Sequence, residues 1–238
     1  MVVDASGVLK VPSDISSEDA AFLPSVETAV SLVQAAQPLL GDRVLVVGQG
    51  LIGLLTGAVL QQLTHADVTV ADVSDHRLAV SAAFNPNAIT WNPSASIPHP
   101  PSFDLSVEVS GNPKGLQTAI DHTGAYGKVI VGSLFGEGLS SLRLGLKFHR
   151  SGVRLLTSQV SHIPPELSGR WDKQRRFDVA WRVLGKIRPS RLLTAPAAPG
   201  ASGSVGGMSA VPLRTADVLR TYEMLERGEQ VTALFKDV

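Results

Sequence analysis

The stretch Arg43-Val44-Leu45-Val46-Val47-Gly48-Gln49-Gly50-Leu51-Ile52-Gly53-Leu54-Leu55 decides the fold of this chain, and Asp72 closes the next apolar run. The pattern predicts a buried strand, a glycine turn and a helix, followed by a second strand that ends in a carboxylate. Gly48 permits the tight turn, Gly50 lets the backbone approach a phosphate, and Gly53 lets the helix pack close to the strand. Together these parts predict a dinucleotide site, against the alternative of a glycine turn with a purely structural role.

Further residues are candidates for contacting the pyrophosphate and the adenosine ribose of such a dinucleotide. The helix that begins at Leu51 and Ile52 offers free N–H groups and the positive end of its dipole to the pyrophosphate. Asp72 lies 19 residues beyond Gly53, where an acid accepts hydrogen bonds from the adenosine ribose and repels a 2′-phosphate. We therefore expect NAD to be preferred over NADP. The alternative for Asp72 is a surface acid after a strand, and Arg77 could either lie near the adenine or pair with Asp75.

Composition restricts the classes of function. The 238 residues carry a formal net charge of zero and include no cysteine. A neutral chain has no long-range attraction for nucleic acid or a membrane surface, so neither partner is expected. The lack of cysteine excludes disulfides, thiolate catalysis and cysteine-ligated zinc. No apolar run reaches the roughly 18–20 residues that span a bilayer, and no secretory signal is visible. A cytoplasmic protein is the expectation.

Outward from the glycine stretch, apolar strand patterns alternate with helical ones. Strands are expected at 43–47, 68–72, 88–91, 104–109, 127–132 and 153–157, and helices at 51–63, 74–84, 113–122 and about 168–185. Before them we expect a short helix capped by Ser16 or Ser17 and a second helix over 27–37. This alternation predicts an α/β fold with a doubly wound, parallel, six-stranded sheet in the order 3-2-1-4-5-6.

The chain divides into four segments on this interpretation. Residues 1–40 form an N-terminal extension whose helices pack on the dinucleotide-binding domain at 41–190. Residues 191–212 are rich in Ala, Gly, Ser and Pro and are expected to form a flexible loop. Residues 213–238 follow with an amphipathic helix at 213–227 and a final strand at 231–235.

Several of these runs resemble a known family. The matching runs are Glu27-Thr28-Ala29, Gly41 to Gly53, Asp72, Glu108-Val109-Ser110-Gly111, Gly127 and Val131-Gly132. They resemble the cofactor domain of the medium-chain (zinc alcohol dehydrogenase-like) dehydrogenases/reductases. A narrower resemblance, to a subgroup that includes bacteriochlorophyllide dehydrogenase-like proteins, is carried by 144–150, 158–161 and 170–176.

The resemblance implies further site residues. It places the turn at Ser110 beside the cofactor, with a helix-entry turn as the alternative. By the same geometry Gly132, Ser133 and Leu134, after the fifth strand, line the nicotinamide side. The predicted cofactor contacts are therefore Gly48, Gly50, Leu51, Ile52, Gly53, Asp72, Arg77, Ser110, Gly132, Ser133 and Leu134.

The resemblance also implies what this chain lacks. In the family a GroES-like catalytic domain precedes the cofactor domain and supplies most zinc ligands, whereas this chain begins about 47 residues before Gly48. The segment 22–27, where the family often carries a cysteine ligand, has none, and the six histidines are scattered. No zinc is expected. Residues 1–12 and 213–238 are interpreted as remnants of the missing domain. A truncated gene model, a minimal form and half of a split protein all stay open.

Function follows as two hypotheses. The first is an NAD(H)-dependent oxidoreductase of the alcohol dehydrogenase type, which transfers hydride to or from a small alcohol or carbonyl compound without zinc. The second is a non-catalytic dinucleotide-binding module, either a pseudoenzyme or a fragment that needs a partner chain. No catalytic residue is assigned, because His149 is better explained by packing. The basic cluster of Arg170, Lys173, Arg175 and Arg176 is interpreted as a solvated helix face or a subunit contact, against the alternative of a phosphate or nucleic-acid contact. The resemblance implies a homodimer through 153–157, or a partner chain that carries the catalytic domain.

Overall fold

The computed structural model of the chain describes residues 8–62, 66–95, 102–137, 141–194, 208–212 and 232–236. The glycine stretch forms β1 (Arg43–Val47), a turn and α3 (Leu51–Gln62), as its pattern predicts. On one side β1 pairs with β2 (Asp67–Ala71), and on the other with β4 (Phe103–Glu108). Four of the five β1 residues are buried, because a central parallel strand is covered on both faces.

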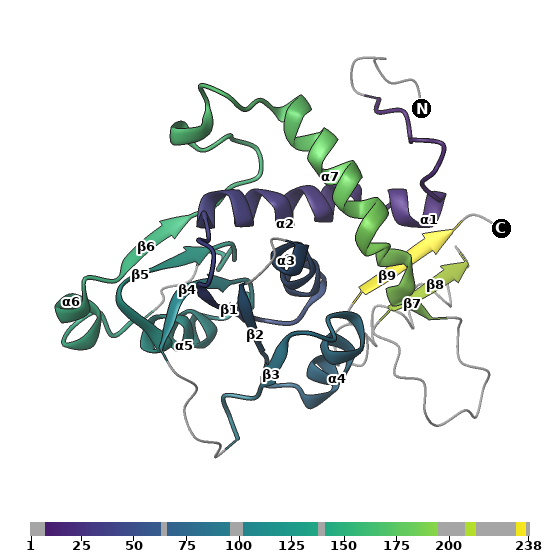
Figure 1. Ribbon diagram of the computed structural model, residues 1–238. Helices are drawn as coiled ribbons and strands as arrows, with labels where there is room; N and C mark the ends of the chain where they lie inside the picture. The colour runs from purple at the N-terminus through teal and green to yellow at the C-terminus, as the bar shows by residue number, and fades with distance from the viewer. Residues whose placement is uncertain are drawn as a thin grey trace.

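The main sheet has six strands. Its order is β3 (Ile89–Trp91), β2, β1, β4, β5 (Thr123–Val131) and β6 (Arg154–Thr157), and every neighbouring pair is parallel. Figure 1 shows the strands fanned in this order, with β6 at one edge. The predicted class and strand order are confirmed.

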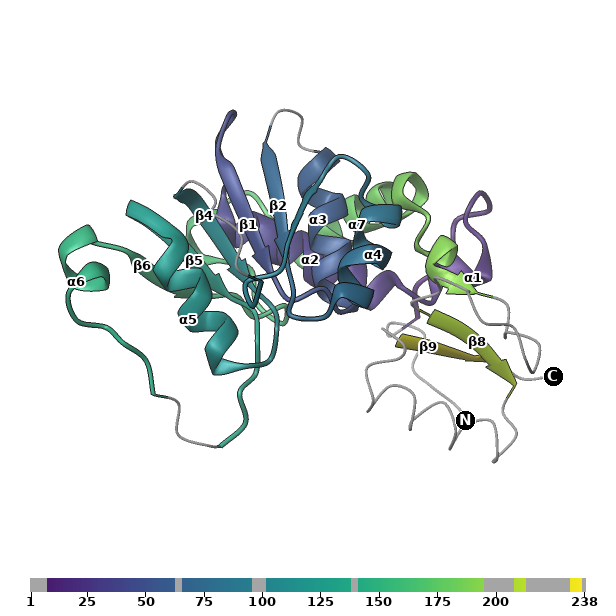
Figure 2. The same cartoon turned by 90° about the horizontal axis from the view of Figure 1, so that it is seen from below.

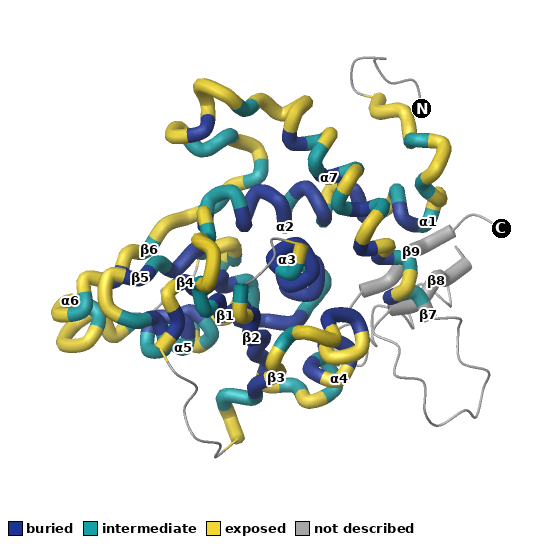
Figure 3. The backbone as a smooth tube through the Cα atoms, viewed as in Figure 1, coloured by how far each residue is buried: buried dark blue, intermediate teal, exposed yellow. Residues whose placement is uncertain are grey.

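Helices cover both faces of the sheet. One core is built where α2 (Leu23–Ala36), α3, α4 (Asp75–Phe84) and α7 (Lys173–Ile187) meet one face. The other core lies under α5 (Pro113–His122) and α6 (Lys147–Ser151), which Figure 2 shows on the opposite side from α2, α3 and α7. Figure 3 shows burial concentrated in α2, α3 and the central strands, with exposed backbone at α6 and β6.

The predicted ends of several elements are corrected by local chemistry. The second helix starts at Leu23 rather than at 27, because Pro24 fits the first helical turn. The last long helix starts at Lys173 rather than at 168, because the Asp172 side chain caps it by accepting from the Arg175 N–H at 2.7 Å. Strand β5 starts at Thr123, four residues before the predicted start, through an irregular pairing with β4.

Short elements complete the described chain. The first helix, α1 (Ser17–Ala20), is capped by Ser16 as predicted. Two 3₁₀ turns, η2 (Pro165–Leu167) and η3 (Pro189–Leu192), flank α7. Among the described residues, no helix combines the length and apolar character needed to cross a membrane.

A second, smaller sheet follows α7. It contains β7 (Leu193–Thr194), β8 (Met208–Pro212) and β9 (Thr232–Lys236), all parallel, with β8 in the middle. The prediction of a loop over 191–212 is therefore wrong at both ends, because strand pairing, rather than the weak apolar signal of these residues, orders them. The final strand lies within one residue of the expected 231–235. The predicted helix at 213–227 lies outside the described residues.

Candidate cofactor site at the carboxyl ends of the strands

The glycine turn after β1 is fixed by close backbone contacts. Gly48 has φ +97°, and a Cβ at this position would lie 2.5 Å from the Ser110 Cα. A Cβ on Gly53 would lie 1.8 Å from the Gly48 carbonyl oxygen. Side chains at either position are therefore excluded. In contrast, a Cβ on Gly50 would meet nothing within 4 Å, so the backbone here faces open space.

Asp72 holds this turn to the end of β2. One carboxylate oxygen accepts a hydrogen bond from the Gln49 N–H at 2.7 Å, and the other accepts from the Ser74 N–H at 2.9 Å. The residue is only 7% exposed. Since a carboxylate has about four acceptor positions, two stay available for a ligand hydroxyl. Asp72 is thus a structural acceptor as well as the predicted ribose acceptor.

Gln49 ties the same turn to α4. Its side chain is fully buried, and its amide N–H groups donate to the Val46 and Gly48 carbonyl oxygens at 3.3 and 3.0 Å. Its side-chain oxygen accepts from the Ser81 hydroxyl at 2.8 Å. Sequence reasoning did not assign a role to either Gln49 or Ser81. The signal was a large polar residue inside the glycine motif, which needs a buried partner.

Arg77 lies beside the predicted ribose acceptor. Its guanidinium is 3.9 Å from an Asp72 oxygen, with about a third of the side chain exposed. The ion pair that Arg77 makes within the described residues is this one, not the alternative pair with Asp75, whose carboxylate accepts from the Asn92 side chain at 2.7 Å. A cation and an anion therefore stand together where an adenosine ribose is expected.

The ends of β4 and β5 are joined by hydrogen bonds. Glu108, wholly buried, accepts from the Ser110 N–H at 2.7 Å and from the Ser110 hydroxyl at 2.6 Å. The Gly111 N–H donates to the Ser133 hydroxyl at 2.8 Å, and the Gly132 N–H donates to the Glu108 carbonyl at 2.9 Å. Burial raises the pKa of Glu108, and the neighbouring Ser110 and Ser133 groups offset only part of that rise.

The structure thus brings the predicted residues to one edge of the sheet, which we call the carboxyl edge. It contains the turns after β1, β2, β4 and β5. Leu51 and Ile52 are half-buried in the first turn of α3, and Leu134 is 93% exposed beyond β5. His149 lies away from this edge, because α6 ends just before the start of β6, and it is exposed while its neighbour Phe148 packs against the second core.

A buried ion pair joins α2 to α7. Arg176 is fully buried, and its guanidinium donates to Glu27 at 2.8 and 3.1 Å and to the Ser31 hydroxyl at 3.3 Å. It also donates to the carbonyl oxygens of His162, at 2.9 Å, and of Val160.

The interpretation of a solvated basic face is therefore wrong for Arg176, because a guanidinium with enough acceptors can be buried. The other three basic residues, Arg170, Lys173 and Arg175, are exposed. Arg175 stacks over Trp171, with 4.2 Å between its guanidinium carbon and the ring centroid.

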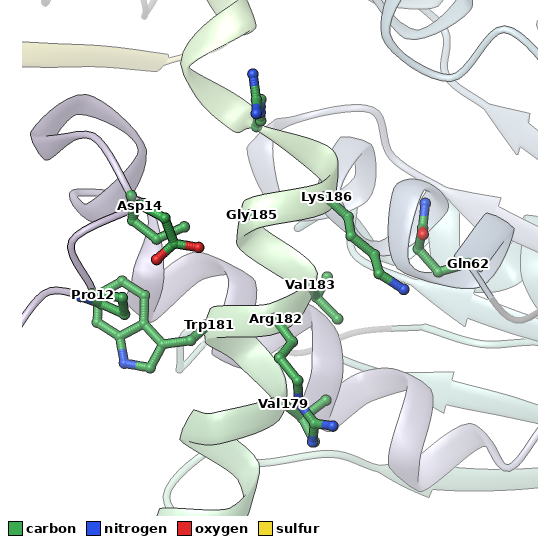
Figure 4. Close-up of a pocket in the computed structure, with 11 residues that line it drawn as sticks. Pro12, Asp14, Gln62, Val179, Trp181, Arg182, Val183, Gly185 and Lys186 are labelled. Atoms are coloured by element: carbon green, nitrogen blue, oxygen red, sulfur yellow. The ribbon is translucent and has the colours of Figure 1, made fainter.

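A cavity of about 760 Å³ lies apart from the carboxyl edge, between residues 12–15 and α7. Figure 4 shows Trp181 and Asp14 at one side of it and Lys186 and Gln62 at the other. None of the predicted cofactor residues lines this cavity. Across the described part of the chain, no three His, Asp or Glu side chains gather as metal ligands would.

Comparison with known proteins gives relatives that are dehydrogenases. No family model matches the chain. L-threonine 3-dehydrogenase of Stenotrophomonas maltophilia (strain K279a) is 28% identical over 198 residues, which are 81% of this chain and 56% of that protein. The chain thus spans little more than half of this relative.

Solved structures match nearly the whole chain. L-idonate 5-dehydrogenase of Escherichia coli superimposes with a TM-score of 0.73 at 20% identity, over 99% of this chain and 62% of that one. A short chain alcohol dehydrogenase of Escherichia coli CFT073, solved with NADH, gives a TM-score of 0.72 at 18% identity, over 98% and 63%. These structures show the fold, and with the sequence relatives they confirm the resemblance to the medium-chain dehydrogenases.

Proposed function

We propose that this chain binds NAD(H) at the carboxyl edge and supports a dehydrogenase reaction on a small alcohol or carbonyl compound. The dinucleotide would extend from the turn after β2, past the glycine turn, to the turns after β4 and β5. Its contacts would be the eleven predicted residues, from Gly48 to Leu134. The nicotinamide supplies the hydride chemistry when it is bound, and the protein supplies position and field.

The open backbone at Gly50 carries this proposal. Two of the three glycines are explained by contacts inside the protein, since a Cβ on Gly48 or Gly53 would meet backbone atoms. Gly50 has no such internal reason, because its missing Cβ faces free space. That space lies at the start of α3, where the first N–H groups of a helix have no intrahelical acceptor. A phosphate is the group that fits both features.

Asp72 and Arg77 have opposite effects on the choice between NAD and NADP, and Asp72 is proposed to have the larger one. The Asp72 carboxylate accepts hydroxyl hydrogen bonds and repels a 2′-phosphate. Arg77 would attract that phosphate, but at 3.9 Å from Asp72 its charge is partly neutralised by the acid. We therefore propose that NAD(H) is preferred as long as Asp72 is present.

A titration of the purified chain with NADH and with NADPH tests this proposal. The wild type is expected to bind NADH more tightly than NADPH. In Asp72→Ala, the ratio of the NADPH to the NADH dissociation constant is expected to fall by about tenfold. The double variant Asp72→Ala with Arg77→Ala is the matched control. Compared with Asp72→Ala alone, it should bind NADPH more weakly and NADH equally well. A folded wild-type chain that binds neither nucleotide would contradict the proposal.

A non-catalytic dinucleotide-binding module is the second candidate. The chain spans 56% of its threonine dehydrogenase relative, and no metal-ligating cluster is found within the described residues. We propose hydride transfer without zinc for the first candidate, and no hydride transfer by the chain alone for the second. Turnover of an alcohol and aldehyde panel by the chain alone would favour the enzyme. Binding of NADH without turnover, restored by a co-purified partner, would favour the module.

Two further properties belong to the proposal. Strand β6 is an edge of the main sheet, and three of its four residues are exposed, so a homodimer could form by pairing two such edges. A cytoplasmic location and the absence of nucleic-acid and membrane partners stay predictions.

A further inference from the structure

Glu108 is a buried acid with an uneven set of partners. Both hydrogen bonds that its side chain accepts, from the N–H and the hydroxyl of Ser110, go to one carboxyl oxygen, Oε1. The other oxygen, Oε2, is buried and has no hydrogen-bond partner among the described residues. The residue is 0% exposed at the last position of β4.

Such a group is a poor means of stabilising a core. A buried polar atom without a partner lowers the free energy of unfolding, and an apolar side chain would fill the place without that penalty. The neighbouring β4 residues Leu105 and Val107 fill their places in this way. We therefore explain the acid at position 108 by the hydrogen bonds that its Oε1 accepts from Ser110.

That oxygen holds the turn of residues 108–112. The Ser110 hydroxyl donates to Glu108 and accepts from the Asn112 N–H at 3.1 Å. The Ser110 backbone lies where a Cβ on Gly48 would clash, and the Ser110 hydroxyl lies 2.1 Å from where a Cβ on Gly115 would be. Ser110 is thus confined between the glycine turn and α5, and Glu108 sets its rotamer.

The turn of residues 108–112 is hydrogen-bonded to the end of β5. Gly111 donates to the Ser133 hydroxyl at 2.8 Å, and the Glu108 carbonyl accepts from Gly132. Gly132 is itself confined, because a Cβ on it would lie 2.6 Å from a Leu32 methyl group. The buried carboxyl therefore holds the first of the two turns that are predicted to face the nicotinamide, and that turn bonds to the second through Gly111 and Ser133.

We propose that Glu108 is a positioning residue: it sets the turns 108–112 and 132–134 and so governs the affinity for the nicotinamide half of the dinucleotide without touching it. This inference rests on the proposed function. It concerns chiefly the nicotinamide half of the ligand, because the hydrogen bonds of the glycine turn and Asp72 go to Gln49, Ser74 and Ser81 rather than to Glu108.

Two ligands separate the halves of the site. NADH carries the nicotinamide, whereas ADP-ribose ends before it and reports on the adenosine and pyrophosphate positions alone. Glu108→Leu, which removes the acceptor but keeps an apolar filling, is expected to weaken NADH binding by about tenfold and ADP-ribose binding by less than about twofold. Glu108→Gln retains an acceptor oxygen for Ser110 and is expected to restore NADH affinity to within about threefold of the wild type.

Ser106→Ala is the matched control. Ser106 is also wholly buried in β4, and its hydroxyl is 2.7 Å from that of Thr123, away from the carboxyl edge. Its loss should leave both affinities unchanged. If Glu108→Leu does not fold, Glu108→Ala carries the same expectation without adding bulk.

The outcomes are distinct. Equal loss of NADH and ADP-ribose affinity in the Leu variant, no loss in either, or no rescue by Gln overturns the positioning role. Failure of both ligands to bind the folded wild type overturns the proposed function instead.

Discussion

Two ionisable side chains in the described part of the chain, Arg176 and Glu108, are 0% exposed, and they differ in how far their hydrogen bonds are satisfied. Between α2 and α7, Arg176 makes five hydrogen bonds, to Glu27, Ser31 and the carbonyls of Val160 and His162. At the end of β4, Glu108 has two hydrogen bonds on one oxygen and none on the other.

The difference separates a structural charge from one held at a site. A guanidinium has five N–H groups, so the five bonds of Arg176 satisfy its donors and lock the segment after β6 against α2. Glu108 is left partly unsatisfied at the edge of the sheet where the cofactor is expected. A fully paired charge such as Arg176 supports the fold, whereas a partly unsatisfied buried acid at a candidate site calls for a functional explanation.

Loss of Arg176 is expected to have the largest effect on stability. Arg176→Ala leaves Glu27 buried without its partner, and the free energy of unfolding should fall by about 3–5 kcal/mol. Denaturant unfolding followed by circular dichroism measures it. The double variant Arg176→Met with Glu27→Leu is the control, and it should recover most of the loss because it removes both charges. A loss below about 1 kcal/mol in the single variant would contradict the structural role of Arg176.

In contrast to Arg176→Ala, Glu108→Gln is expected to raise the free energy of unfolding, by an amount that depends on pH. Because the folded pKa of Glu108 lies above its ordinary value of 4.5, the protonated acid stabilises the fold fully below pH 4.5. That contribution is lost as the pH rises through the folded pKa. Gln does not titrate, so the variant should be more stable than the wild type at neutral pH, by about 1–3 kcal/mol.

Thermal unfolding of both proteins from pH 4 to pH 8 tests this sign. The advantage of the Gln variant should grow with pH and should shrink towards pH 4. Parallel curves would mean that Glu108 has the same pKa in the folded and the unfolded chain, and would contradict the raised folded pKa.

Asp72 falls between the two buried charges. Each of its oxygens accepts from a backbone N–H, and Arg77 lies 3.9 Å away. Asp72→Asn turns one acceptor into a donor that faces another donor, so we expect a loss of about 1 kcal/mol in unfolding free energy. Asp75→Asn, at the first residue of α4, is the control. A loss as large as that of Arg176→Ala would show that the glycine turn depends on Asp72 for folding.

Asp104→Asn is expected to have the smallest effect. Asp104 accepts from the Arg43 N–H at 2.9 Å and pairs with its guanidinium at 3.4 Å, with both side chains more than 40% exposed. The backbone hydrogen bond from Arg43 lowers the pKa of Asp104 below its ordinary value of 3.8. Its contribution is therefore present above pH 3.8 and is lost as the pH falls through the lowered pKa. At pH 7 the loss should stay below about 1 kcal/mol in urea unfolding.

The sequence predicted the parts of the fold whose signals are local. The glycine turn follows from residues that lie close together, Gly48 to Gly53. The strand order follows from the regular alternation of strand and helix patterns along the chain. Asp72 was found because its distance from the motif is fixed by one helix and one strand.

The rest depended on contacts between distant residues. The acceptor of Arg176 is Glu27, 149 residues earlier, and the helical pattern of α7 alone made this arginine one of four similar cations. Glu108 was quoted only as part of a run, because the bond from its turn to Ser133, through the Gly111 N–H, forms only once β4 and β5 are paired. Strand β8 was hidden for the same reason, since its small residues have weak strand propensity and its order comes from β9.

The pairing of β1 with β4 has a consequence for how the chain folds. Val44 lies opposite Leu105, 61 residues later, whereas β1 and β2 enclose a single helix. Closing the longer loop has the higher entropic barrier, so we expect the half built from β1 to β3 to form first and its joining to β4 to be slow. Because Gly48 meets Ser110 only across that pairing, the candidate cofactor site assembles in this late step. The rate at which NADH binding appears during refolding should therefore report the slowest event on the folding pathway.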